Sequence, residues 1–127
     1  MANARGGCVR SYRDLVVWQK AMAMVTGAYQ LTKSFPREEI YGLSSQLRRS
    51  AVSVPSNIAE GYGRKSTQDY LRFLNIANGS LFELQTLLEI SRNLEYIPED
   101  TFTNHFAVSR EVERMLSSLI RKIRNSN

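Results

Sequence analysis

The 127-residue chain has few of the residue types on which several classes of protein depend. Its one cysteine, Cys8, excludes an internal disulfide and gives no sign of an oxidising compartment. Its one histidine, His105, has no histidine or cysteine cluster that would complete a metal site. No apolar run approaches the ~20 residues that span a bilayer, and no signal-peptide core follows Met1. These absences predict a cytoplasmic protein with no membrane partner, metal or cofactor.

The composition is also poor in strand signals. Three prolines, seven glycines and a shortage of clustered β-branched residues argue against a sheet protein. Hydrophobic residues make up 43% of the chain, which is enough for one globular core but, at this length, not for two. Residues 1–10 are predicted to form a flexible tail, and residues 11–127 a single domain.

Apolar residues recur at helical spacing along four segments of the chain. Proline and glycine mark the breaks between these segments, and hydroxyl side chains precede a helix start. The first helix is expected to run from Arg13 to Lys33. The second is expected to begin at Gly42, or just after Pro36, and to end at Gly61 or Gly63. Ser66 or Thr67 is expected to cap the third helix, and Pro98 to take the first position of the fourth. Four long amphipathic helices joined by short breaks predict an all-α, antiparallel up-down-up-down four-helix bundle.

Two of these helices carry apolar arcs that are wider than one bundle core requires. On the first helix, a stripe from Leu15 to Tyr29 runs beside a second stripe from Val17 to Leu31. On the third helix, Ile76 and its neighbours widen a leucine seam to about half the circumference. The alternatives are deeper burial in a broad core and a second face buried against a neighbouring subunit.

The second helix has a continuous polar face on the side opposite its apolar face. Pro55 lies in the middle of this helix, where it removes an amide donor at a typical cost of ~3 kcal/mol or more. A polar face beside a costly proline predicts a specified interface with another subunit or partner. This polar stripe consists of Gln46, Arg49, Ser53, Asn57 and Glu60.

The same region carries a family resemblance. The stretch LSSQLRRSAVSVPSNIAEGYGRKS (residues 43–66) closely resembles the signature of small bacterial four-helix-bundle proteins of S23 type, encoded in intervening sequences of large-subunit ribosomal RNA genes. The resemblance continues in YRDLVVWQKA (12–21), LTKSFP (31–36) and FLNIANGSLFEL (73–84). Accessory variability proteins of diversity-generating retroelements share this bundle, as homopentameric barrels that bind nucleic acid and a reverse transcriptase. The resemblance therefore implies a ring-like homo-oligomer, a pentamer by analogy.

The net charge of +5 is distributed unevenly, and the sequence pI is 9.7. Residues 1–20 hold four basic and one acidic residue, and residues 110–127 hold five basic and two acidic ones. Residues 66–109 instead hold two basic and six acidic residues. Such a pattern suits polyanion binding and equally suits head-to-side association of subunits.

The fourth helix gives the clearest binding signal. Arg110, Arg114, Arg121 and Arg124 follow one another at i, i+4, i+11 and i+14, opposite the apolar face. One interpretation is a solvated outer face. The other is a phosphate-binding surface, because guanidinium groups pair bidentately with phosphates. This set is called the arginine stripe below.

A second basic candidate follows the glycines that end the second helix. The spacing of a P-loop is absent, so the favoured interpretation of this segment is a simple two-glycine turn between helices. The alternative is a modest anion site, because Arg64 and Lys65 precede the free amides of the third helix.

No nucleophile, base and oxyanion hole come together in the sequence, which predicts a protein that is not an enzyme. The predicted function is a non-enzymatic homo-oligomeric bundle that binds structured RNA or another nucleic acid through its basic outer surfaces. The alternative is a protein–protein scaffold, such as an accessory subunit for a reverse transcriptase or an RNA-processing enzyme.

Overall fold

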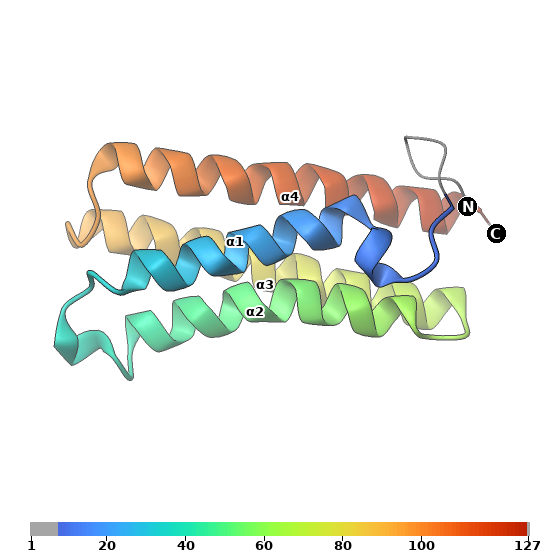
Figure 1. Ribbon diagram of the computed structural model, residues 1–127, viewed down its shortest axis with the longest axis horizontal. Coiled ribbons are helices and arrows are strands. Elements are labelled where there is room, and N and C mark those ends of the chain that lie inside the picture. Colours follow the sequence, from blue (N-terminus) through green and yellow to red (C-terminus); the bar gives the residue numbers. More distant parts are fainter. Residues whose placement is uncertain (1–7, 127) are drawn as a thin grey trace.

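The computed structural model describes residues 8–126. It contains four long helices, α1 (Val16–Thr32), α2 (Leu43–Tyr62), α3 (Thr67–Asn93) and α4 (Glu99–Asn125), and two 3-10 turns, η1 (Tyr12–Asp14) and η2 (Arg37–Glu39). Figure 1 shows the helices side by side in alternating directions, with the start of α1, the α2–α3 turn and the end of α4 at one end. The predicted all-α, up-down-up-down four-helix bundle is therefore confirmed.

The helices form a four-cornered arrangement around one core. α2 contacts α1 and α3, and α4 contacts α3 and α1, with the most extensive packing between α2 and α3. Within the described part of the chain, no helix is both long and apolar enough to cross a bilayer. The larger aliphatic side chains that are fully excluded from solvent come from α2, α3 and α4: Leu47, Val54, Ile58, Leu74, Leu81, Val112 and Leu116.

The start of α1 differs from the prediction. Asp14 accepts hydrogen bonds from the backbone amides of Arg10 (2.8 Å) and Ser11 (3.3 Å), so it stabilises η1 and not the first turn of a long helix. Leu15 then adopts an extended backbone, with ψ of 122°, and α1 begins only at Val16. Of the predicted tail, residues 1–7 lie outside the described residues, whereas Val9 packs half-buried against the core.

The other helix ends lie closer to the boundaries predicted from the sequence. α2 begins after Gly42 and ends before Gly63, as predicted, and it continues through the buried Pro55. Ser66 caps α3, since its hydroxyl accepts a 3.0 Å hydrogen bond from the amide of Asp69. Pro98 is the cap of α4 and not its first residue, because its extended ψ of 161° precedes the helical turn.

The close packing of α2 and α3 depends on Gly61. A Cβ atom at this position would lie 2.9 Å from Cβ of Phe73 and 3.1 Å from Cδ1 of Tyr70. Side chains do not tolerate such distances, so the two helices approach closely only because residue 61 lacks a side chain. This contact also brings the α2–α3 turn against the first turns of α3.

One of the two apolar stripes on α1 is wholly buried in the core, whereas the other is buried only in part. The stripe from Val17 to Leu31 is buried throughout, with Ala21 fully excluded from solvent. Met22 and Tyr29 of the neighbouring stripe remain 43% and 42% exposed, as does Ile76 on α3 at 42%. A broad core within one chain therefore does not account for these side chains.

Candidate nucleic-acid interface

The arginine stripe lies on the outer face of α4, and its members differ in whether a carboxylate neutralises them. All four of its arginines are exposed. Arg110 forms a 3.3 Å ion pair with Glu113, which also accepts a 3.0 Å hydrogen bond from Gln85. Arg114, Arg121 and Arg124 have no ion pair or hydrogen bond among residues 8–126. Their charges remain available to a polyanion.

Antiparallel folding brings the two basic candidates to the same end of the molecule. The turn with Arg64 and Lys65 lies at the end where α4 finishes with Arg121 and Arg124 (Figure 1). We call this region the basic end; its basic residues are Arg10, Arg13, Arg64, Lys65, Arg72, Arg121, Lys122 and Arg124, and its acidic residues are Asp14, Glu60 and Asp69.

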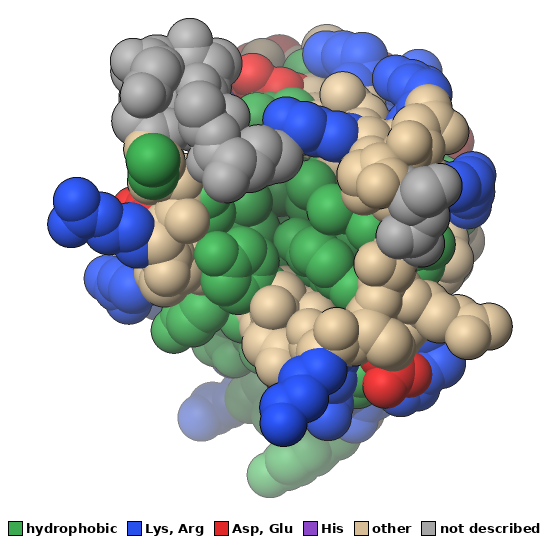
Figure 2. Space-filling view, turned by 90° about the vertical axis from the view of Figure 1, so that its right-hand side faces the viewer, with side chains coloured by type: hydrophobic (Ala, Val, Ile, Leu, Met, Phe, Trp, Pro, Cys, Tyr) green, Lys and Arg blue, Asp and Glu red, His purple; other side chains and the backbone are tan. Residues whose placement is uncertain are grey.

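Figure 2 looks directly at the basic end. Lys and Arg side chains surround its rim, and hydrophobic side chains fill much of the middle, with few carboxylates in view. Half-buried residues that pack on the core here include Tyr62, Tyr70 and Ile123. Burial raises the pKa of Tyr70 to about 12, so its hydroxyl stays neutral and adds no negative charge to this end.

Aromatic packing holds two of the arginines in place. The guanidinium carbons of Arg64 and Arg72 lie 4.5 and 4.6 Å from the ring centroid of Phe73. Asp69 partly neutralises Arg72 across 3.6 Å, whereas Arg64 has no carboxylate partner in the described range. Stacking on a ring positions a guanidinium without cancelling its charge. The turn therefore presents a fixed cation beside the start of α3.

The polar stripe of α2 is split between two environments. Ser53 and Asn57 are half-buried: the Ser53 hydroxyl lies 2.7 Å from the Ser80 hydroxyl of α3, and Asn57 donates to the Ser53 carbonyl at 2.8 Å within α2, which holds Ser53 in place. Gln46, Arg49 and Glu60 are exposed. The first pair therefore fixes the contact between α2 and α3 inside one chain, and only the other three remain available to a partner.

A groove between α1 and α2 was not predicted as a site. It has a volume of about 360 Å³, and the exposed Met22 and Val52 stand on its two sides. Pro55, which the sequence linked to a predicted interface, forms part of its wall. The sequence signals for this surface were Pro55 and the wide apolar arc of the first helix, but neither indicated a groove between the two helices. The lining residues are Tyr12, Trp18, Met22, Val25, Val52, Pro55, Ser56 and Ala59.

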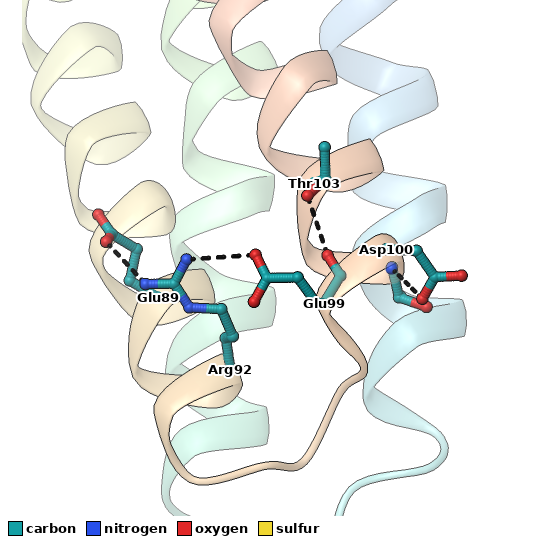
Figure 3. A network of polar contacts seen from close by, with 6 residues as sticks. Glu89, Arg92, Glu99, Asp100 and Thr103 are labelled. Carbon is teal, nitrogen blue, oxygen red and sulfur yellow. Dashed lines mark hydrogen bonds and ion pairs between the residues drawn. The ribbon is translucent and has the colours of Figure 1, made fainter.

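The opposite end of the bundle carries an acidic network between α3 and α4, drawn in Figure 3. Arg92 lies 3.4 Å from Glu89 and 3.7 Å from Glu99, and its guanidinium carbon is 4.2 Å from the Phe102 ring centroid. Because Glu99 begins α4, this arginine joins the end of one helix to the start of the next. The guanidinium group of Arg92 is therefore engaged in contacts that hold the two helices together.

His105 lies on α4 facing α1, where its ring contacts the position of Gly27. Burial lowers its pKa, so the ring is neutral at pH 7 and adds nothing to the positive charge. Residues 8–126 contain no group of three or more histidine, cysteine or carboxylate side chains that would hold a metal ion.

Comparisons with known proteins agree with the fold and the sequence signature. The model of the family described as 23S rRNA-intervening sequence protein matches residues 13–118. A crystal structure of a protein of unknown function from the S23 ribosomal protein family of Bacteroides thetaiotaomicron superimposes with a TM-score of 0.78 at 29% identity. The match covers 84% of this chain and 96% of that one. A search of curated protein sequences gave no match.

Proposed function

The chain belongs to the 23S rRNA-intervening sequence protein family, and from this premise we propose that it is a non-enzymatic bundle that binds structured RNA. The observation that carries the proposal is the convergence of eight basic and three acidic residues at the basic end. Arg121 and Arg124 belong to this surface and Arg114 extends it along α4, all three with guanidinium groups that are free of partners among the described residues. Phosphate contacts of this kind supply most of the sequence-independent affinity for nucleic acids.

Self-association strengthens such binding. The groove between α1 and α2 leaves Met22 and Val52 exposed beside Pro55, and apolar surface of this type is stabilised by burial against a second copy of the chain. A ring-like homo-oligomer, by family analogy a pentamer, would repeat the arginine stripe around its circumference. Weak contacts to one polyanion then add up through effective concentration.

Filter binding of a 23S rRNA fragment across a salt series tests the RNA proposal. The triple variant Arg114→Gln, Arg121→Gln and Arg124→Gln should keep its helicity, since exposed substitutions cost at most ~0.5 kcal/mol each. The slope of log affinity against log salt should fall by about 2 to 3, at ~0.7–0.9 per lost phosphate contact. Arg110→Gln is the matched control and should change the slope least, because Glu113 already neutralises Arg110.

Two results would count against this proposal. Absence of RNA binding even at low salt would remove it altogether. A triple variant with the slope of the wild type would reduce the arginine stripe to a solvated face, and Arg64 and Lys65 would then be the residues to replace.

The groove also favours a second candidate, a protein–protein scaffold serving a reverse transcriptase or another RNA-processing enzyme. In that case Gln46, Arg49 and Glu60, which stay exposed on α2 outside the groove, would contribute polar contacts to the partner. Co-purification with and without nuclease separates the two functions. A partner protein retained after nuclease treatment favours the scaffold, and one lost with the RNA favours RNA binding.

A further inference from the structure

A second cavity lies at the end of the bundle opposite the basic end, where α1 finishes and α2 begins. It has a volume of about 400 Å³, within the range of small-ligand pockets. Three of its lining residues are cationic, none is acidic, and the remainder are two hydroxyl residues and three apolar ones. The lining residues are Thr32, Lys33, Phe35, Pro36, Arg37, Ile40, Ser44 and Arg48.

Ser44, in the first turn of α2, and Arg48, one turn further on, line one side of this cavity, and the first turn has free hydrogen-bond donors. Gly42 offers no side chain as a cap, and the carboxylate of Glu39 satisfies only the amide of Leu43, at 3.0 Å. The amides of Ser44 and Ser45 have no acceptor among the described residues. A helix of 20 residues adds partial positive charge at this position.

The side chain of Ser44 is an independent sign of a ligand. It is 5% exposed, lines the cavity, and makes no hydrogen bond within the described range. The other buried serines, Ser50, Ser91 and Ser109, each donate to a carbonyl of their own helix at 2.7–3.0 Å. Because this hydroxyl opens into the cavity and has no partner among residues 8–126, it is free to bond to a group that enters there.

Arg48 is held in place without a carboxylate. Its Nε donates a 2.7 Å hydrogen bond to the buried hydroxyl of Thr32, and its guanidinium carbon lies 4.8 Å from the ring centroid of Tyr29. Thr32 itself donates to the backbone carbonyls of α1, which fixes its orientation. The terminal Nη groups have no partner in the described part of the chain, so they remain available for a bidentate contact.

We propose that this cavity binds the phosphate group of a small phosphomonoester. The Ser44 hydroxyl and amide together with Arg48 supply donors from more than one direction, which suits the tetrahedral arrangement of phosphate oxygens, and the free amide of Ser45 lies next along the same turn. Lys33 and Arg37 add positive charge at the rim. The apolar residues Phe35, Pro36 and Ile40 contact the organic part of the ligand.

The test uses the full chain, with inorganic phosphate, pyrophosphate and AMP as probes and sodium chloride at equal ionic strength as the salt control. In 15N-edited NMR titrations, phosphate and AMP should shift the amides of Ser44 and Ser45 saturably. Ser44→Ala and Arg48→Gln should each weaken AMP binding about tenfold or more, as expected for a lost hydrogen bond to a charged group. Arg49→Gln, which changes the exposed neighbouring arginine outside the cavity, should leave AMP affinity unchanged.

If Ser44→Ala perturbs the fold, Arg48→Gln still tests the proposal, because the guanidinium group of Arg48 lies at the edge of the core and its removal should leave the fold intact. The proposal is wrong if millimolar phosphate, pyrophosphate and AMP leave the two amides unmoved, or if Arg49→Gln weakens binding as much as Arg48→Gln does. It is also wrong if RNA alone shifts these amides, because the site would then be part of a nucleic-acid surface.

Discussion

Replacing Gly61 by alanine tests whether the α2–α3 contact sets the stability of the bundle. The added Cβ would lie 2.9 Å from Cβ of Phe73 and 3.3 Å from the carbonyl oxygen of Tyr70, atoms attached to or part of the α3 backbone. They cannot rotate away, so the helices must separate. Overpacking of this kind costs ~1–3 kcal/mol, against a helix-propensity gain of up to ~1 kcal/mol. A net loss of about 1–2 kcal/mol is expected.

Gly79 provides the matched control, since it also lies inside a helix. No described atom lies within 4 Å of a Cβ built there, so Gly79→Ala should stabilise the protein by ~0.5–1 kcal/mol. Thermal unfolding followed by circular dichroism at one protein concentration measures both changes. Gly61→Ala should lower Tm by about 4–8 °C, and Gly79→Ala should raise it by about 2–4 °C. A Gly61→Ala protein as stable as the wild type would refute the argument from close approach.

Three further predictions concern the carboxylate at the start of α2, the cap of α3 and assembly. Hydrogen bonds from the Leu43 amide and the Tyr96 hydroxyl lower the pKa of Glu39, so its contribution to stability is full above about pH 4.5 and disappears as the pH falls through the lowered pKa. The Tm difference between wild type and Glu39→Gln should therefore be larger at pH 7 than at pH 3, and an equal difference at both would contradict this. Ser66→Ala removes the cap of α3 and should cost ~0.5–2 kcal/mol in urea unfolding, whereas Ser126→Ala near the chain end should cost less. Light scattering at micromolar concentration should give a mass well above the 14.5 kDa of one chain, and a monodisperse monomer would overturn the proposed self-association.

Helical periodicity was sufficient to predict the architecture. Residues such as Leu47, Leu74 and Leu81 recur on one face of their helices, and burying those faces together leaves few arrangements besides a bundle. The start of α1 was missed because Asp14 bonds two local amides and holds a 3-10 turn. A short polar side chain can stabilise either structure, so its position in the sequence does not decide between them.

The candidate sites were only partly predictable, because they depend on how helices are rotated against one another. The exposure of the arginine stripe and the i,i+3 pair of Arg110 with Glu113 follow from spacing on one helix, but the hydrogen bond from Gln85 to Glu113 needs α3 beside α4. The phosphate cavity combines the end of α1, η2 and the first turns of α2. No spacing rule connects Thr32 with Ser44 across two chain breaks, so this site was found only in three dimensions.

The separation of charge along the bundle gives the molecule an electric dipole. The basic end has eight basic residues against three acidic ones, whereas the opposite end has six acidic residues, Glu38, Glu39, Glu89, Glu95, Glu99 and Asp100, against five basic ones, Lys33, Arg37, Arg48, Arg49 and Arg92. The 27 residues of α4 place these ends ~40 Å apart, about five times the ~8 Å over which physiological salt screens charge. The field of a nearby polyanion therefore rotates the molecule so that its basic end approaches the polyanion first. At that distance salt screens the repulsion between the polyanion and the acidic residues of the opposite end.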